Sequence, residues 1–212
     1  GGGIRIAGLA GRAAEAWLYW AVITDGLPPD EVATIMLRRE QPTRSVQRTL
    51  TGTEVGQGVT SCWWGGTLIT VYRARVPTTV AIGNGSHLVT LPAGVPGATD
   101  GSDPRAGSPM PAYEGASLVV IQDAGADTVA LYDADFAGRT FTGNGGPAVD
   151  LALPGAIAGS DHRMRMHLIG ADGQDGGGGL AIRADMSGET TSVNGIPVGG
   201  PGSARNDSDW NG

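Results

Sequence analysis

The sequence predicts an all-β protein, folded as a two-sheet, jelly-roll-like β-sandwich. Short runs rich in β-branched and aromatic residues, bounded by Gly, Pro, Asn or Asp, recur along all 212 residues. This pattern is typical of strands joined by turns. The 37 glycines and 13 prolines supply the turns, while an apolar fraction of 40% is enough to bury a core. The runs amount to about ten to twelve strands, which suits a sandwich.

The chain is expected to form a single domain, residues 1–212. Its length is within the range that an all-β sandwich reaches as one unit, and no internal repeat is visible. Within this domain, residues 1–11 are a candidate exchanged N-terminal strand, and residues 198–212 are expected to be a loop-like tail.

Six strands are predicted in the first half of the chain. The second of them is apolar on both faces and is therefore expected to be a central strand that is covered on both sides. The third is favoured as a strand because Val32, Thr34 and Ile35 are β-branched; a helix over residues 30–39 with Asp30 as N-cap is the alternative. The six are residues 4–7, 15–23, 31–37, 46–50, 67–76 and 86–91.

In the second half, residues 117–121 and 128–132 flank the turn-forming segment 123–127 and are predicted to be paired strands. Residues 94–110 are polar, unpatterned and longer than normal connections, so they are expected to form a flexible or binding loop. The remaining predicted strands are residues 139–141, 148–153, 163–169, 180–184 and 191–193.

Several short motifs, taken in order, resemble those of a known family. They are AEAWLYW at 14–20, Cys62 followed by Trp63, VYRAR at 71–75, GNGS at 83–86, and GASLVV with VALYD within 114–136. This order resembles that of a widespread class of secreted bacterial surface domains. The resemblance implies a β-sandwich module of an extracellular protein, in a family whose members often have no assigned activity. The chain departs from the pattern at Arg75, where the family usually has Asp, and in having no second Cys.

The resemblance also implies a missing strand, because a further strand-forming segment usually follows the motif found here at 210–212. A sandwich without that strand has an open edge, which another chain can complete. The N-terminal segment of one copy is expected to fill the vacancy in the next, and a head-to-tail contact of that kind propagates as a filament. The residues expected at this contact are Ile4, Ile6, Leu9 and Trp210. Cleavage of the C-terminus is the alternative explanation.

A calcium site is predicted in the glycine-rich segment that contains Asp172, Gln174 and Asp175. Oxygen ligands on near-alternate residues of a glycine-containing loop are what Ca²⁺ requires. Similar acidic clusters occur at 100–103 and 206–209, and an ordinary Asx turn is the alternative at all three. The three histidines do not have the spacing or the cysteine partners of a zinc site.

Carbohydrate binding by a monomeric adhesive module is the second function that the sequence allows. Exposed tryptophan rings stack on sugars, and Trp63 and Trp64, which precede a predicted strand, are the candidate glycan-binding residues together with the loop 94–110. Packing in the core or at an interface is the alternative for this pair. Trp17 and Trp20 are expected to lie in the core because they belong to the strongest predicted strand. Calcium could stabilise such a module.

Composition and motifs argue against several other classes. A net charge of −7 and a pI near 4.8 disfavour nucleic-acid binding, which needs a basic face. No apolar run is long enough to span a membrane. The sequence contains no serine-hydrolase elbow, phosphate loop or dinucleotide fingerprint, so a non-catalytic protein is expected. Cys62 is the single cysteine, which suggests a small buried residue or a bond to another chain.

Overall fold

The structure of the protein is a computed structural model. It describes residues 2–11, 13–41, 45–59, 67–77, 83–91, 110–123, 129–133, 167, 191–193 and 195–199. The chain divides into two compact units, residues 1–163 and 164–212, and each is described by itself. Within the described ranges, no helix has the length and hydropathy needed to cross a membrane.

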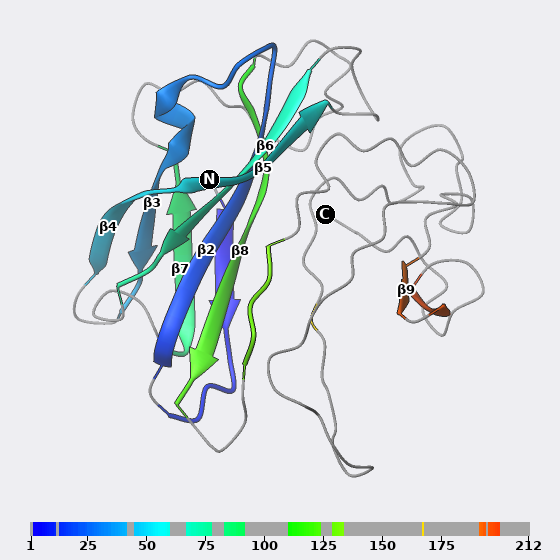
Figure 1. The fold of residues 1–212 in the computed structure, drawn as a ribbon. Helices are drawn as coiled ribbons and strands as arrows, with labels where there is room; N and C mark the ends of the chain where they lie inside the picture. Colours follow the sequence, from blue (N-terminus) through cyan, green and yellow to red (C-terminus); the bar gives the residue numbers. More distant parts are fainter. Residues whose placement is uncertain are drawn as a thin grey trace, which may run out of the picture. The chain divides into compact units, whose positions relative to one another are not determined.

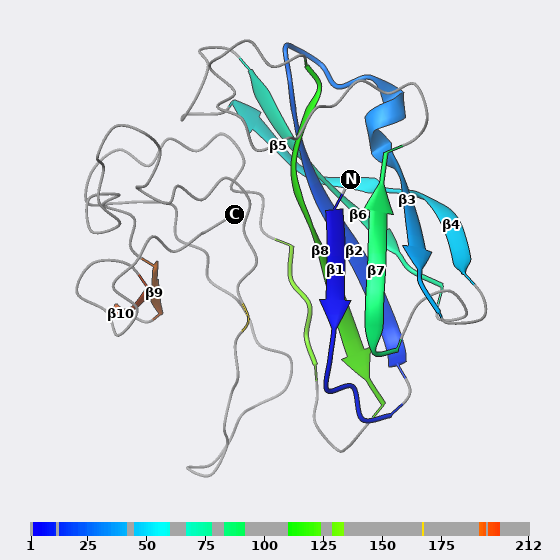
Figure 2. The same cartoon turned by 180° about the vertical axis from the view of Figure 1, so that it is seen from behind.

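The first unit is a sandwich of two four-stranded antiparallel sheets (Figures 1 and 2). Sheet A has the order β1–β7–β3–β4, in which the strands are β1 (Gly2–Ile6), β7 (Gly85–Thr90), β3 (Thr34–Arg39) and β4 (Val46–Thr51). Sheet B has the order β5–β6–β2–β8, in which the strands are β5 (Thr53–Val59), β6 (Leu68–Arg75), β2 (Ala13–Thr24) and β8 (Ala112–Gln122). The predicted all-β, two-sheet sandwich is therefore confirmed.

The main core lies between the two sheets and is centred on β2. Alternate residues of this strand point inward, and Leu18, Trp20 and Val22 are all almost completely buried. The Trp20 indole N–H donates to the backbone carbonyl of Val32 at 3.0 Å, and its ring stacks on Tyr72 with the centroids 5.7 Å apart. The expectation that Trp20 belongs to the core is confirmed.

One end of β2 is also covered on its other face. Ala21 and Ile23 form a second buried cluster with Ile69 and Ala112. The predicted burial on both faces is therefore confirmed at this end of the strand. It is wrong at the other end, where Trp17 and Tyr19 are only half-buried.

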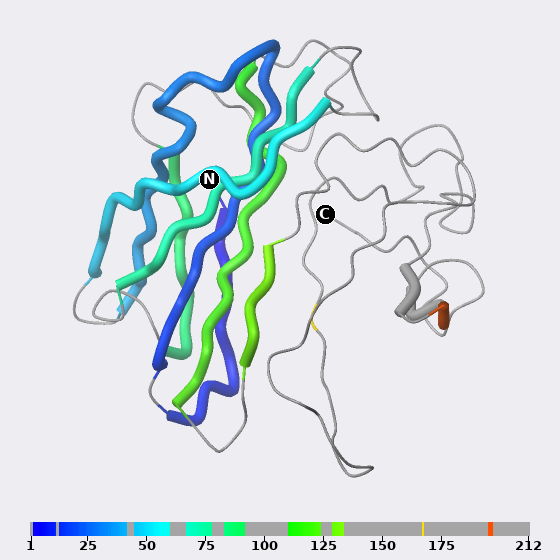
Figure 3. The backbone as a smooth tube through the Cα atoms, viewed as in Figure 1, coloured from blue at the N-terminus to red at the C-terminus, as the bar shows by residue number. Residues whose placement is uncertain are grey.

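The chain passes from sheet A to sheet B at Gly52, between β4 and β5 (Figure 3). The Gly52 N–H donates to the carbonyl of Ala33 at 2.8 Å, which fixes the corner. A Cβ at this position would collide with the Trp20 ring and would lie 2.9 Å from the Tyr72 Cβ. Only glycine allows the backbone to cross so close to the core.

Two sequence predictions around sheet A are corrected. The expected strand 31–37 begins as a short 3₁₀ helix, η1 (Asp30–Ala33), with Pro29 rather than Asp30 at the N-cap position, and β3 follows it. Val32 is buried, and its carbonyl accepts a hydrogen bond from the Trp20 indole. This contact between residues of different elements favours the turn, and it cannot be seen in the local sequence. The GNG segment at 83–85 has the composition of a hairpin turn and is predicted to be one, but it does not join β6 and β7 in a hairpin, since these strands belong to different sheets.

Two further corrections concern sheet B. Strand β5 was not predicted, because its two glycines interrupt the alternation, yet it pairs with β6 along its length. Residues 117–121 lie in β8 as predicted, but the expected partner strand is absent: residues 129–133 run beside β8 without strand structure (Figures 1 and 2). A side-chain contact of Asp133, described below, holds this segment against the sheet.

The second unit contains the antiparallel pair β9 (Thr191–Val193) and β10 (Ile196–Gly199). The strand predicted at 191–193 is confirmed, whereas the loop-like tail is wrong for residues 198 and 199. Of the predicted strand 163–169, only His167 is described, and it is exposed. The predicted strands 139–141, 148–153 and 180–184 lie outside the described residues, as does the loop 94–110 except for Met110.

Candidate functional site

One side of the sandwich is open between the edge strands of its two sheets. β1 ends sheet A, and β8 ends sheet B. Between them lies a cavity of about 240 Å³. The cavity is lined by residues of β1, β3, β7 and β8 and by the residue that follows β7. These lining residues are Gly2, Gly3, Ile4, Ile35, Val89, Leu91, Tyr113, Glu114, Gly115 and Ala116. Most of these residues are apolar or glycine.

The cavity exists because β1 has a glycine at an inward position. In the pairing of β1 with β7, Gly2 lies opposite the buried Val89, and Ile4 lies opposite the buried His87. Residues directly opposite each other share a face, so Gly2 and Ile4 point toward the core. Ile4 packs against the core, whereas a Cβ at Gly2 would meet no atom within 4 Å. The missing side chain of Gly2 therefore leaves the space unfilled.

The wall contributed by β8 contains an irregularity and a buried hydroxyl. Glu114 is skipped in the pairing of β8 with β2, so Tyr113 faces inward beside Val22. The Tyr113 hydroxyl is buried and has no hydrogen-bond partner among the described residues. Burial, with a smaller contribution from Tyr72, raises the pKa of Tyr113 to about 12, so the hydroxyl keeps its proton at neutral pH.

The connection from β1 to β2 is held by one side chain from the start of β7. The Asn84 carboxamide accepts from the Leu9 N–H at 2.8 Å and donates to the Leu9 carbonyl at 3.1 Å. On either side of Leu9, Gly8 and Gly11 adopt φ values of 76° and 143°, which favour glycine. Asn84 thus satisfies both backbone groups of Leu9, as a neighbouring strand would.

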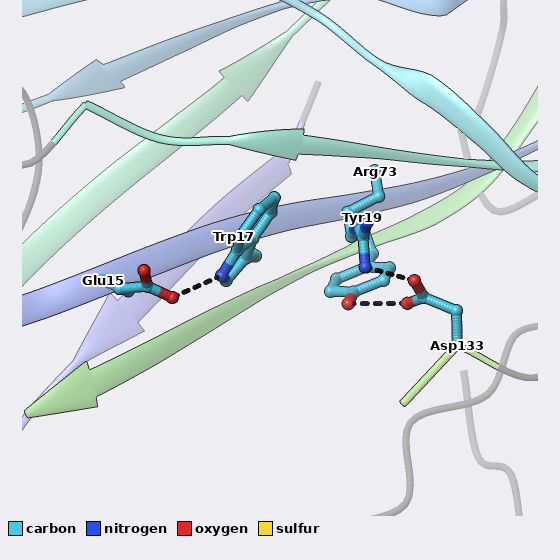
Figure 4. Close-up of polar contacts among 5 residues, drawn as sticks. All are labelled: Glu15, Trp17, Tyr19, Arg73 and Asp133. Atoms are coloured by element: carbon cyan, nitrogen blue, oxygen red, sulfur yellow. Dashed lines mark hydrogen bonds and ion pairs between the residues drawn. The ribbon is translucent and has the colours of Figure 1, made fainter. Parts of the chain in front are cut away.

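A second cluster lies on the outer face of sheet B (Figure 4). The guanidinium of Arg73 stands 4.7 Å from the centre of the Trp17 ring and forms an ion pair with Asp133. The Tyr19 hydroxyl donates to the same carboxylate at 2.9 Å. Burial, followed by the hydrogen bond to Asp133, raises the pKa of Tyr19. All of these polar groups are paired, so the cluster fastens residues 129–133 to the sheet.

Glu15 extends this cluster along β2. Its carboxylate accepts from the Trp17 indole N–H at 3.3 Å and from Arg75 at 3.2 Å. The prediction that Trp17 lies in the core is wrong, because alternation along β2 turns this residue to the outer face while Trp20 points inward. Arg75, which departs from the family pattern, is the partner of Glu15.

The predicted assembly residues are partly described. Ile4 and Ile6 are half-buried in β1, which pairs with β7 of the same chain, and Leu9 is held by Asn84. The other predicted site residues lie outside the described part of the chain: Trp63, Trp64, Trp210, Asp172, Gln174 and Asp175. Among the residues that the structure describes, no three His, Cys, Asp or Glu residues come together as metal ligands.

Of the residues that line the cavity, Ile4 was selected from the sequence as an assembly residue. Gly2 belongs to the candidate exchanged segment 1–11 and Val89 to the predicted strand 86–91, but only their pairing shows that they frame a cavity. The GNGS motif could have pointed to Asn84, since asparagine between two glycines is typical of a backbone-binding turn residue. Nothing in the sequence around Tyr113 indicates that its hydroxyl is buried.

Comparison with protein-family models, with curated proteins and with solved structures finds no match to this chain.

Proposed function

We propose that this protein is a non-catalytic structural module of an extracellular surface assembly, and that copies of it associate by strand complementation. The observation that carries the proposal is the open side of the sandwich, where β1 and β8 end their sheets on either side of an apolar cavity. Extracellular location is part of the proposal and is supported by the resemblance to secreted surface domains.

The edge strand β1 is suited to receive another strand. Edge strands present unpaired N–H and C=O groups, and proteins usually protect them with charges, prolines or covering segments. The half of β1 that lines the cavity consists of Gly2, Gly3 and Ile4, which carry no charge. β8 differs, since the charged Glu114 lines the cavity and residues 129–133 of the same chain run beside this strand (Figures 1 and 2). An extended segment can therefore approach the backbone of β1 closely.

The N-terminal segment, which the sequence predicts as the donor strand, is paired within its own chain. β1 pairs with β7 of its own chain from Gly2 to Ile6, and Asn84 holds the connection that follows. Donation of residues 1–11 to another copy would require β1 to leave β7. In the arrangement described here, β1 is part of the surface that accepts a strand.

Light scattering after size-exclusion chromatography, over a hundredfold range of protein concentration, tests the proposal. We expect species larger than the monomer whose proportion grows with concentration, and ordered filaments or layers of the same sample in the electron microscope. A single monomeric species at every concentration would overturn the proposal. Glycan arrays and calcium titration would then test the adhesive alternative.

A further inference from the structure

The cavity between β1 and β8 has the size and access expected of a side-chain pocket. Its volume of about 240 Å³ is below the roughly 300–1,000 Å³ of small-molecule pockets. At Gly2, Gly3 and Gly115 an added Cβ would meet no atom within 4 Å, so there is free space beside the backbone at these three positions of the rim. The buried residues Ile35 and Val89 form apolar lining. An aliphatic side chain from outside the chain can enter without displacing the residues already there.

The same unit displays an apolar segment outside its strands. Val129, Leu131 and Tyr132 are 58%, 37% and 40% exposed, and they make up half of the six exposed large hydrophobic residues in the described part of the chain. Exposed apolar stretches of this kind mark interaction sites. The segment has the composition of a strand, yet residues 129–133 form none.

Two details make this segment a suitable donor. Val129 and Leu131 are two residues apart, so in an extended chain they share a face with the spacing of the inward positions Gly2 and Ile4. Asp133, bound to Tyr19 and Arg73, tethers the segment at its C-terminal end while Val129 and Leu131 stay exposed. Neither aliphatic side chain lines the cavity of its own chain.

We propose that the segment Val129–Tyr132 of one copy adds as a strand along β1, at the open side of a second copy, and places an aliphatic side chain, Val129 or Leu131, in the β1–β8 cavity. This inference rests on the proposed self-association and identifies its donor and its acceptor. The two surfaces are different parts of the same unit, so the contact is heterologous. Each copy that accepts a strand still has one to donate, and the assembly can continue.

The acceptor is tested by filling the cavity from within. Gly2→Val places a side chain at the inward position opposite Val89 and occupies the space that the donor requires. We expect this variant to unfold at a higher temperature than the wild type and to lose self-association. The control is Ser86→Val, which adds the same kind of side chain at an exposed position of β7 that lies opposite Arg5 and does not line the cavity, and which should still associate.

The donor is tested by removing its apolar side chains. The double variant Val129→Ser with Leu131→Ser should weaken self-association at least about tenfold, the change expected when the burial of one aliphatic side chain is lost. Leu27→Ser is the control, because Leu27 is 84% exposed and belongs neither to the donor segment nor to the residues that line the cavity. Circular dichroism and the unfolding midpoint confirm that each variant folds.

Mixing the two kinds of variant gives the decisive result. The Gly2→Val chain keeps its donor and the double serine variant keeps its acceptor, so each alone should be monomeric and an equimolar mixture should form a closed 1:1 dimer. A mixture that stays monomeric, or a Gly2→Val variant that assembles like the wild type, would overturn this inference and leave the proposed function standing. A wild-type chain that is monomeric at every concentration would overturn both.

Discussion

Two tryptophans three residues apart on β2 have opposite roles. Trp20 is 1% exposed, stacks on Tyr72, and donates its indole N–H to a backbone carbonyl of η1. Trp17 is half-buried on the other face, where Arg73 covers its ring and Glu15 accepts its N–H. The first joins the two sheets, and the second belongs to a polar cluster that fastens a loop segment to the outside.

The difference shows how a strand that is apolar on both faces can be misread. Both sides of β2 carry large apolar residues, and from the sequence both faces qualify for burial. The inner face is closed by sheet A, which cannot be seen in the local pattern. On the outer face, the tryptophan and tyrosine serve as apolar bodies with polar ends, and their partners are charged side chains.

The largest expected effect is at Trp20. Trp20→Ala should lower the free energy of unfolding by about 3–5 kcal/mol, because it removes a buried aromatic ring and leaves a cavity between the sheets. Trp17→Ala should cost only about 1–2 kcal/mol, since the ring is half-buried and its cation–π contact contributes roughly 0.5–1 kcal/mol. Urea denaturation of both variants measures the difference. Equal losses would contradict the assignment of the two faces.

Alkaline pH should lower the stability of the protein through the ionisation of Tyr113, which lies on the inner face of β8. The pKa of Tyr113 is raised to about 12, so its contribution to stability is complete below pH 10, the pKa of the unfolded side chain, and is lost as the pH rises toward 12. The loss amounts to about 2–3 kcal/mol.

Tyr113→Phe tests this assignment. The variant should lack that part of the alkaline decline, which unfolding curves at pH 9, 10 and 11 measure. It should be at least as stable as the wild type at pH 7, because the substitution removes a buried hydroxyl that has no hydrogen-bond partner in the part of the chain that the structure describes. The same pH dependence in both proteins would show that Tyr113 is not buried as described.

Gly52 tests how closely the corner between the sheets approaches Trp20. Gly52→Ala should destabilise the protein by about 1–3 kcal/mol, because the new methyl group would collide with the Trp20 ring and with Tyr72. Gly115→Ala is the control, since a Cβ there meets no atom within 4 Å. Thermal unfolding should show a lower midpoint for the first variant and an unchanged or higher midpoint for the second.

The smallest effect is expected on the outer face of sheet B. Asp133→Asn removes the ion pair with Arg73 and should cost no more than about 1 kcal/mol, because partly exposed pairs contribute little. Hydrogen exchange should nevertheless become faster at the backbone amides of residues 129–133. An unchanged exchange rate would show that the Asp133 contact does not hold this segment.

Much of the sandwich could be predicted from residue patterns. Residues 15–23, 67–76 and 86–91 were identified as strands because β-branched and aromatic residues recur in them between glycines, and they correspond to β2, β6 and β7. Strand β5 was missed because Gly56 and Gly58 weaken its pattern, and its pairing with β6 supplies what the local sequence lacks. The turn η1 was missed because the hydrogen bond from the Trp20 indole to the Val32 carbonyl joins residues twelve positions apart, and local residue patterns do not reveal such a contact.

The candidate site was less accessible to sequence reasoning. Ile4 and Ile6 were selected as assembly residues on their apolar character alone, and the structure places them in the edge strand beside the cavity. Gly2 was not selected, because the absence of a side chain has no consequence until the strand opposite is known. Asp133 was not selected either, since its partners Tyr19 and Arg73 lie more than 50 residues away along the chain.

By itself, the sequence determined the fold class and the positions of most strands of the sandwich, because alternation and turn residues act locally. Only the tertiary structure decided which face of β2 is core, where the two sheet edges meet, and that a glycine opposite Val89 leaves a cavity between them. These features depend on the pairing of residues distant in sequence. Closure of a sandwich is therefore a property of the packed sheets and is absent from any single strand.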